Sequence, residues 1–434
     1  MPGTAVVRLN VRVVADFMVG GGSDNGYKAP PQGTNTQGIT SKYAPYYFGE
    51  YARLYPAFDG VTQNGIKYGA SAEIRQNSGG IGINQAFANN NATAGNTLFW
   101  RRETMYVGTD KLGTLRFGQT DGVQSLFIVG TFENFDYEGG WDGDLPALFS
   151  GGQTSGVGTS LNWNFPDTSA WYGSSKLVYL SPNFGGFDFG FDWEPASNQT
   201  SGDGACVGTG TNASPNVPTN TITVGCATVT SLAGPFSLIG SQLATRRNLT
   251  TVGARYRGVF GPVGLVAEGA WVHSGHVSDA NPFIDPVAFK GLNYFDAGLV
   301  GTFGGLAVGG NVVAGEKNAT TLLVKGGKHE LDFVVGTSYA AGPFIVGASF
   351  MNELFQGAWN GNAATNTQNT YGIEHDIGVS VGATFNWAPG ASLYVDYLWG
   401  QRHQANRDFF AATTGKFNNA TRAQGIVIGQ AFQW

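Results

Sequence analysis

Hydrophobic and polar side chains alternate along the first segment of the chain, residues 4–19. One face carries Val7, Leu9, Val11, Val13 and Phe17, and the other carries Arg8, Asn10, Arg12 and Asp16. Successive side chains of a β-strand point to opposite faces, so this period of two predicts a half-buried strand. Residues 66–75 repeat the pattern, with Lys67, Ser71, Glu73 and Arg75 on the polar face.

The last segment, residues 421–434, alternates in the same way and ends in aromatic residues. Ile426, Ile428, Phe432 and Trp434 share one face. Outer-membrane β-barrel chains commonly end on such a strand. Phe432 and Trp434 are therefore predicted to form a C-terminal assembly signal.

Short turn signals separate further alternating segments of strand length. They are Asp59-Gly60, Asp110-Lys111, Asn183-Phe184-Gly185, Phe260-Gly261-Pro262, Phe303-Gly304, Ala341-Gly342-Pro343 and Ala388-Pro389-Gly390. Seven turns make seven hairpins, and the first and last segments bring the predicted total to sixteen strands, an even number as bacterial single-chain barrels require. Both chain ends are then expected on the side of the short turns.

Long connections join the other ends of these segments. They are centred on residues 20–43, 78–97, 120–173, 194–243, 274–290, 315–326, 355–370 and 402–421. Long loops without structure of their own are uncommon in a compact soluble domain. Short turns on one side and long loops on the other are typical of a membrane barrel.

The low charge of the chain supports a membrane protein, because Asp, Glu, Lys and Arg make up 12% of the residues against roughly 25% in soluble domains. The longest uncharged stretch, residues 297–315, contains too many glycines for a spanning helix. A bilayer accepts only helices or closed barrels. We therefore predict one all-β transmembrane domain, an antiparallel barrel over residues 1–434 of the bacterial outer membrane, with a soluble β-protein as the alternative.

The facing of the strands follows from the same argument. The apolar set should face lipid, because each arginine turned to the bilayer midplane would cost about 2–4 kcal/mol. Barrels of sixteen to eighteen strands are too wide for side chains to fill, so the lumen should hold water. The chain is then predicted to be a channel.

Charge and cysteines limit the partners. The net charge of −6 and the pI near 5.4 argue against nucleic acid, which needs clustered positive charge. Cys206 and Cys226 lie in the connection 194–243 and are expected to form a disulfide in an oxidising compartment, with two free thiols as the alternative. No secretory signal precedes Thr4, so we expect a mature form.

The connection 120–173 is the best candidate to narrow the lumen. No Lys or Arg occurs between Arg116 and Lys176, whereas the segment is rich in acidic and aromatic residues. A loop folded into the barrel would pack its aromatic rings on the wall and present carboxylates to the pore. The acidic residues proposed for the constriction are Glu133, Asp136 and Glu138. The alternative is an acidic surface loop with Ca²⁺ held by oxygen ligands, although its spacing matches no known Ca²⁺ loop; no other cofactor is expected.

A basic wall is predicted opposite this loop. It comprises Arg8, Arg12, Arg53, Arg75, Arg101 and Arg116, all in the first five strands. Alternation turns Arg8, Arg12, Arg75 and Arg116 inward, whereas it leaves Arg53 ambiguous and does not decide between Arg101 and Arg102. Carboxylates facing guanidinium groups across a gap create a transverse field that favours polar and charged solutes.

The stretch RRETMYVGTDKLGTLRFGQTDG, from Arg101 to Gly122, resembles the general trimeric porins of Gram-negative bacteria. The resemblance covers the whole chain as a pattern. Family members often carry Arg where this chain has Gln119, and this difference leaves the charge of the constriction open. They also often end in Phe where this chain has Trp434, which is a conservative aromatic change.

The resemblance implies a homotrimer with the third loop folded into each pore and passive diffusion of small hydrophilic solutes and ions. It implies that Arg8, Arg12, Arg75 and Arg116 line the basic wall and that Glu133, Asp136 and Glu138 line the opposing loop. Partners would be outer-membrane lipid, lipopolysaccharide and, through the last strand, the barrel assembly machinery.

Other functions compete with this interpretation. Aromatic residues of the third loop, Phe127, Phe132, Phe135, Tyr137 and Trp141, would form a sugar-binding track in a substrate-specific channel. The polar connection 194–243 would suit a structural or adhesive barrel. An enzyme is the least supported, because Ser274, between His273 and His276, has no acid in the relation that a catalytic triad requires.

Overall fold

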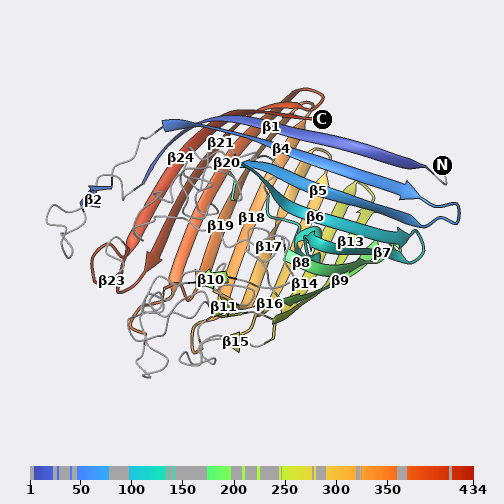
Figure 1. Cartoon of the computed structure of the whole chain (residues 1–434). Coiled ribbons are helices and arrows are strands. Elements are labelled where there is room, and N and C mark those ends of the chain that lie inside the picture. Colours follow the sequence, from blue (N-terminus) through green and yellow to red (C-terminus); the bar gives the residue numbers. More distant parts are fainter. Residues whose placement is uncertain are drawn as a thin grey trace.

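Sixteen strands close into one antiparallel barrel in the computed structural model (Figure 1). The structure describes residues 4–22, 27–28, 40–41, 46–77, 97–132, 135, 140–141, 174–196, 208–210, 222–224, 244–245, 247–275, 278–279, 290–318, 323, 325–358, 369–409 and 413–434. Each barrel strand pairs with its neighbours in the chain, and β1 also pairs with β24 to close the ring. The predicted strand number and fold are confirmed.

The first half of the wall is built from β1 (Ala5–Gly22), β4 (Tyr46–Val61), β5 (Lys67–Asn77), β6 (Thr97–Thr109), β7 (Gly113–Thr120), β8 (Ser174–Leu180), β9 (Phe187–Ala196) and β13 (Arg247–Phe260). The second half is built from β14 (Val263–His273), β16 (Asn293–Phe303), β17 (Leu306–Glu316), β18 (Glu330–Ala341), β19 (Phe344–Phe355), β20 (Glu374–Ala388), β21 (Ala391–Gln404) and β24 (Ala420–Gln433). Both chain ends lie on the side of the short turns (Figure 1).

Short elements occur within the longer connections. The two-stranded pairs are β2 (Tyr27–Lys28) with β3 (Thr40–Ser41), β10 (Gly208–Gly210) with β11 (Ile222–Val224), β12 (Ala244–Thr245) with β15 (Ser278–Asp279), and β22 (Arg407–Asp408) with β23 (Thr413–Thr414). One short helix, α1 (Val123–Phe127), follows β7. No helix among the described residues is long and apolar enough to cross a membrane.

Six of the seven predicted turns join consecutive barrel strands, and the seventh, Asp59-Gly60, was wrong. Both residues lie inside β4. The turn comes later, where the Thr62 N–H donates to the Ile66 carbonyl at 2.8 Å and Gly65 has a φ of +84°. The glycine at position 60 has another role, because a β-carbon there would lie 2.5 Å from the Tyr68 ring.

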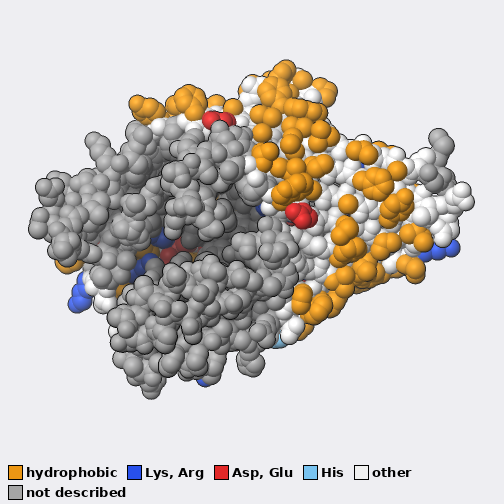
Figure 2. All heavy atoms as spheres, viewed as in Figure 1, with side chains coloured by type: hydrophobic (Ala, Val, Ile, Leu, Met, Phe, Trp, Pro, Cys, Tyr) orange, Lys and Arg blue, Asp and Glu red, His pale blue; other side chains and the backbone are white. Residues whose placement is uncertain are grey.

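The alternation of the strands follows the predicted facing. On β9, Phe187, Phe189, Phe191 and Trp193 are between 41 and 48% exposed, whereas Asp188, Asp192 and Glu194 are at most 7% exposed. Figure 2 shows hydrophobic side chains spread over the visible strand wall and both blue and red side chains inside the hollow. Apolar residues therefore face lipid, and ionisable ones mainly face the interior.

One contact spans the seam where the barrel closes. The Tyr394 hydroxyl on β21 donates to the Asp16 carboxylate on β1, across the intervening strand β24. The strand between them has Gly429 at this point, where a β-carbon would collide with both partners. The last residue also closes the seam, since the Trp434 and Val11 backbones exchange hydrogen bonds of 3.1 and 2.9 Å. Phe432 lies on the outer face, 38% exposed.

We predict that Tyr394→Phe lowers the stability of the barrel by about 1–3 kcal/mol, because a buried carboxylate loses a hydrogen-bond donor. The measurement is urea unfolding of protein refolded in lipid vesicles. Tyr397→Phe is the matched control: this tyrosine lies on the same strand but faces outward, with its hydroxyl 3.0 Å from Gln424. Equal losses in both variants would contradict a role for the seam.

Candidate functional site

Inward arginines form a row across the first barrel strands. Arg12 on β1 lies directly opposite Arg53 on β4, which lies opposite Arg75 on β5. Directly opposed residues have β-carbons about 4.5–5.5 Å apart, so these like charges are neighbours. The Arg53 guanidinium lies 4.2 Å from the centroid of the Tyr51 ring, and that of Arg12 lies 5.6 Å from it. The electron-rich face of the ring offsets part of the repulsion.

A β-bulge extends the row to the fourth strand. Glu73 pairs with Arg102 and Ile74 pairs with Trp100, so Arg101 is the extra residue. A bulge sets two residues against one and breaks the alternation. Both Arg101 and Arg102 consequently reach Glu73 on the inner side. The sequence did not decide which of the two arginines faces the pore, and in the structure both side chains lie on the inner side. We call Arg12, Arg53, Arg75, Arg101 and Arg102 the arginine row.

Glu73 is the anion at the centre of this row. Its side chain is 3% exposed and makes ion pairs with Arg75, Arg101 and Arg102, the second at 3.3 Å. Arg102 also donates to Asp121, at the start of the loop after β7, at 2.8 Å. Five guanidinium groups against two carboxylates leave a formal charge of +3 on these seven described residues. The three arginines around Glu73 retain 18 to 26% exposure, so water reaches them.

Two predicted wall residues lie inside the barrel but outside the row. The Arg8 Nε donates to Asp59 at 2.8 Å, and the Tyr106 hydroxyl donates to the same carboxylate at 2.5 Å. Arg116 lies on β7, directly opposite Tyr106. Both arginines face inward as predicted, near the short-turn end.

The loop after β7 lies against the inner wall of the barrel. Phe127, Phe132, Phe135 and Trp141 are at most 6% exposed. The Trp141 indole N–H donates to the Ser349 hydroxyl on β19 at 2.9 Å. These described residues therefore extend from β7 along the inner wall to β19. Glu133, Asp136, Glu138 and Tyr137 lie outside the described residues, as do Cys206 and Cys226.

Glycines on the inner face of successive strands make room for this loop. A β-carbon at Gly190 on β9 or at Gly253 on β13 would lie 2.8 Å from Val123. One at Gly336 on β18 would lie 2.7 Å from the Phe132 ring, and one at Gly347 on β19 would collide with Phe135. These glycines form a track in the wall, where the missing side chains leave room for the loop.

Buried polar groups fasten the start of the loop to this track. The Val123 N–H donates to Asp192 at 2.5 Å. The Gln124 amide donates to Asp296 at 2.9 Å and accepts the Tyr294 hydroxyl at 2.7 Å. Arg255 donates to the Leu126 carbonyl at 3.1 Å and lies over the Phe127 ring at 4.6 Å. Because buried polar groups are costly to leave unpaired, each of these contacts fixes the position of the loop.

A row of carboxylates on the far wall escaped the sequence analysis. Asp332 on β18 faces Glu353 on β19, which faces Asp376 on β20, and all three are at most 2% exposed. Counting residues away from the Ala341-Gly342-Pro343 turn on both strands places Asp332 opposite Glu353. The sequence alone therefore contained the information that pairs these two carboxylates. No group of three or more His, Cys, Asp or Glu side chains in the described part of the chain is arranged to hold a metal ion.

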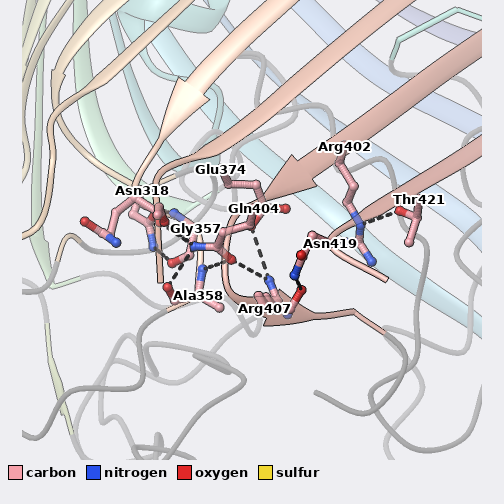
Figure 3. Close-up of polar contacts among 11 residues, drawn as sticks. Asn318, Gly357, Ala358, Glu374, Arg402, Gln404, Arg407, Asn419 and Thr421 are labelled. Carbon is pink, nitrogen blue, oxygen red and sulfur yellow. Dashed lines mark hydrogen bonds and ion pairs between the residues drawn. The ribbon is translucent and has the colours of Figure 1, made fainter. Parts of the chain in front are cut away.

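A polar network at the long-loop end stabilises the strand ends beside this carboxylate row (Figure 3). The Gln404 amide donates to the carbonyls of Gln356, Ala358 and Gly372 at 2.9 to 3.0 Å. Arg402 lies opposite Asp376 and donates to Thr421 at 3.0 Å. The network joins the bases of neighbouring connections, and its buried groups are hydrogen-bonded rather than open to solutes.

The described residues give little support to a sugar-binding track or to a catalytic serine. Phe127, Phe132, Phe135 and Trp141 are buried against the wall, so these described rings offer no open aromatic track for sugars. The Ser274 hydroxyl accepts the Leu292 N–H at 2.8 Å and is 2% exposed. His273 stacks on Trp271 with centroids 5.4 Å apart, and His276 lies outside the described residues. These contacts are structural.

Comparisons with known proteins agree with this geometry. The model of the Gram-negative porin family matches residues 11–403. No curated protein sequence matches significantly. Among solved structures, an anion-selective porin from Comamonas acidovorans has a TM-score of 0.53 at 14% identity, over 99% of this chain and 100% of that one. The in-vitro folded trimer form of OmpT, an outer membrane protein of Vibrio cholerae, has a TM-score of 0.51 at 12% identity, over 99% of both chains.

We predict that Gly336→Leu lowers the single-channel conductance, because the new side chain displaces Phe132 from the wall toward the lumen. Planar-bilayer recording measures the effect. Gly301→Leu is the control, since that glycine lies on the outer face and its nearest neighbouring atom would be 3.9 Å away. Unchanged conductance in a folded Gly336→Leu barrel would show that the track does not position the loop.

Proposed function

The chain belongs to the Gram-negative porin family, and on this premise we propose that its arginine row and third loop together determine which solutes pass. The protein is an outer-membrane channel, a multi-pass β-barrel for passive diffusion of small hydrophilic solutes and ions. The proposal concerns the selectivity of this channel, which depends on the charges that line it.

The observation that carries the proposal is the excess of positive charge in the arginine row. A formal charge of +3 on partly hydrated side chains raises the local concentration of anions and lowers that of cations. The positions are held by cross-strand pairing and by Glu73, so the field has a fixed direction. The similar porin from Comamonas acidovorans is anion-selective, and we propose the same preference for this chain.

We further propose that Glu133, Asp136 and Glu138 form the acidic side of the gap. They follow directly on Phe132, which the structure holds on the wall at β18, across the barrel from the arginine row. A loop fastened on both sides of this segment, at Phe132 and at Trp141, has a short span in which to present its carboxylates. Opposed charges of fixed position would orient polar solutes as they pass.

We also propose a homotrimer that contacts lipopolysaccharide and is inserted by the barrel assembly machinery through Phe432 and Trp434. The trimer form of OmpT, which shares the fold, supports the oligomer. The aromatic end of β24 supports the second part, since Phe432 remains on the lipid face of the closing strand. Single-domain organisation over residues 1–434 and a Cys206–Cys226 disulfide stay predictions.

We predict that the double variant Arg75→Gln with Arg101→Gln loses anion preference. The reversal potential under a KCl gradient should shift toward that of K⁺, with the chloride-to-potassium permeability ratio falling by about twofold or more, because the local positive potential decreases. Arg257→Gln is the control: this arginine also faces inward but pairs with Asp188 at 3.0 Å outside the row. An unchanged ratio in the double variant would refute the proposal.

Glu73→Gln tests the sign of the same field. Removing the central negative charge should raise the chloride-to-potassium permeability ratio, opposite to the arginine variants. Glu50→Gln is the control, because it changes the net charge equally on an exposed outward position of β4. If Glu73→Gln lowered the ratio, the arginine row would not be the selectivity site.

A further inference from the structure

A guanidinium group lies on the lipid-facing side of β24, among apolar side chains. Arg422 on β24 is exposed and shares the outer face with Ile426 and Ile428, which are 41 and 55% exposed. Its inward neighbours, Thr421 and Ala423, are 1 and 2% exposed. A guanidinium on the lipid face is unfavourable unless it lies near the interface and meets an anion. Arg422 lies near the start of β24, at the long-loop end of the barrel, and therefore near the membrane interface.

Other polar groups gather beside Arg422 on the same face. Its Nε donates to the Gln401 carbonyl oxygen at 2.8 Å. One row nearer the end of the barrel, His403 on β21 lies opposite His375 on β20. His403 is exposed, and the His375 ring lies 2.7 Å from the Asn352 side chain. Arg422, Gln401, His403 and His375 form what we call the outer rim cluster.

An apolar groove begins below this cluster on the same wall. It has a volume of about 590 Å³, in the range of clefts that hold small molecules. Tyr339 on β18 and Tyr397 on β21 line it, and the aliphatic side chains Val346, Ala348, Val381 and Ala383 line it on the two strands between them. Ile426, four residues along β24 from Arg422, also lines it. At about 3.3 Å per residue, the groove begins roughly 13 Å from the arginine.

We propose that this wall binds a phosphorylated, acylated lipid of the outer leaflet, with a phosphate on the outer rim cluster and an acyl chain in the groove. Arginine and imidazole N–H groups suit phosphate oxygens, and charge-assisted hydrogen bonds are strong. A groove between two tyrosines, lined by short aliphatic side chains, fits a flexible chain better than the convex strand wall of a second copy. The proposal adds a specific lipid position to the proposed contact with lipopolysaccharide.

Native mass spectrometry of detergent-purified protein tests the site. The probes are bis-phosphorylated lipid A, the same lipid without phosphates, and phosphatidylethanolamine. We expect the parent protein to retain bis-phosphorylated lipid A in preference to both others. Arg422→Gln should reduce this retention about tenfold or more, the equivalent of one lost charge-assisted hydrogen bond.

Groove variants separate the acyl site from the headgroup site. Ala383→Phe fills the groove and should lower retention of all acylated probes. Ala297→Phe is the matched control, an exposed outward alanine on β16. Phosphate-independent retention, or equal retention by the parent protein and Arg422→Gln, would overturn the proposal. A changed oligomer mass in Ala383→Phe with unchanged lipid content would assign the groove to a second copy instead.

The same samples distinguish this site from the pore proposal. Arg422 faces outward, so the reversal potential of Arg422→Gln should equal that of the parent protein. If Arg422→Gln loses lipid retention but keeps the ion selectivity of the parent protein, the lipid site is supported. This holds whether or not the arginine-row variants change the permeability ratio. Folded barrels are identified beforehand by their altered gel migration before and after heating, so a failure to fold is not counted as a loss of binding.

Discussion

Every barrel strand has a hydrogen-bonded neighbour on both sides, because hydrocarbon offers no other partner for backbone polar groups. Closure of the ring, from β1 to β24, is therefore the constraint on which the rest of the structure depends. It fixes the inward and outward sets of each strand, since a slip of one residue would exchange them. The arginine row, the glycine track and the carboxylate row all follow from this single register. Tyr394, Gly429 and Asp16 stabilise it where the first and last strands meet.

Within that register, the site depends on where the chain departs from regular alternation. The bulge at Arg101 brings two adjacent arginines to the same carboxylate, which a regular strand does not allow. Gly253 and Gly336 remove side chains from the inner face, so the loop approaches the wall backbone. Glycine inside a strand ordinarily weakens it. Here the loss is offset by the packing of Phe127 and Phe132 and by the hydrogen bonds of Gln124.

The sequence predicted what alternation and turn chemistry determine. Strand number, the inward facing of Arg8, Arg12, Arg75 and Arg116, and the packing of the third-loop aromatics on the wall all follow from local pattern. It failed at Asp59-Gly60, because a glycine that makes room for Tyr68 looks the same as one that turns the chain. It did not resolve Arg101 against Arg102, because a bulge depends on the partner strand. It missed the carboxylate row: counting from one turn pairs Asp332 with Glu353, but Asp376 joins them only when β20 is placed in register with β19.

The two charged rows differ in how far water reaches them. The arginines around Glu73 keep contact with water, whereas Asp332, Glu353 and Asp376 are almost completely buried. A charge changes the concentration of passing ions only where water and ions can approach it, which is why we assign the proposed selectivity to the hydrated row and not to the buried one. Within the buried row, Asp376 lies opposite Arg402, which is two residues from Gln404 on β21. The net charge of the chain, −6, therefore does not determine the sign of the pore, because the accessible lumen charges that the structure describes are predominantly basic.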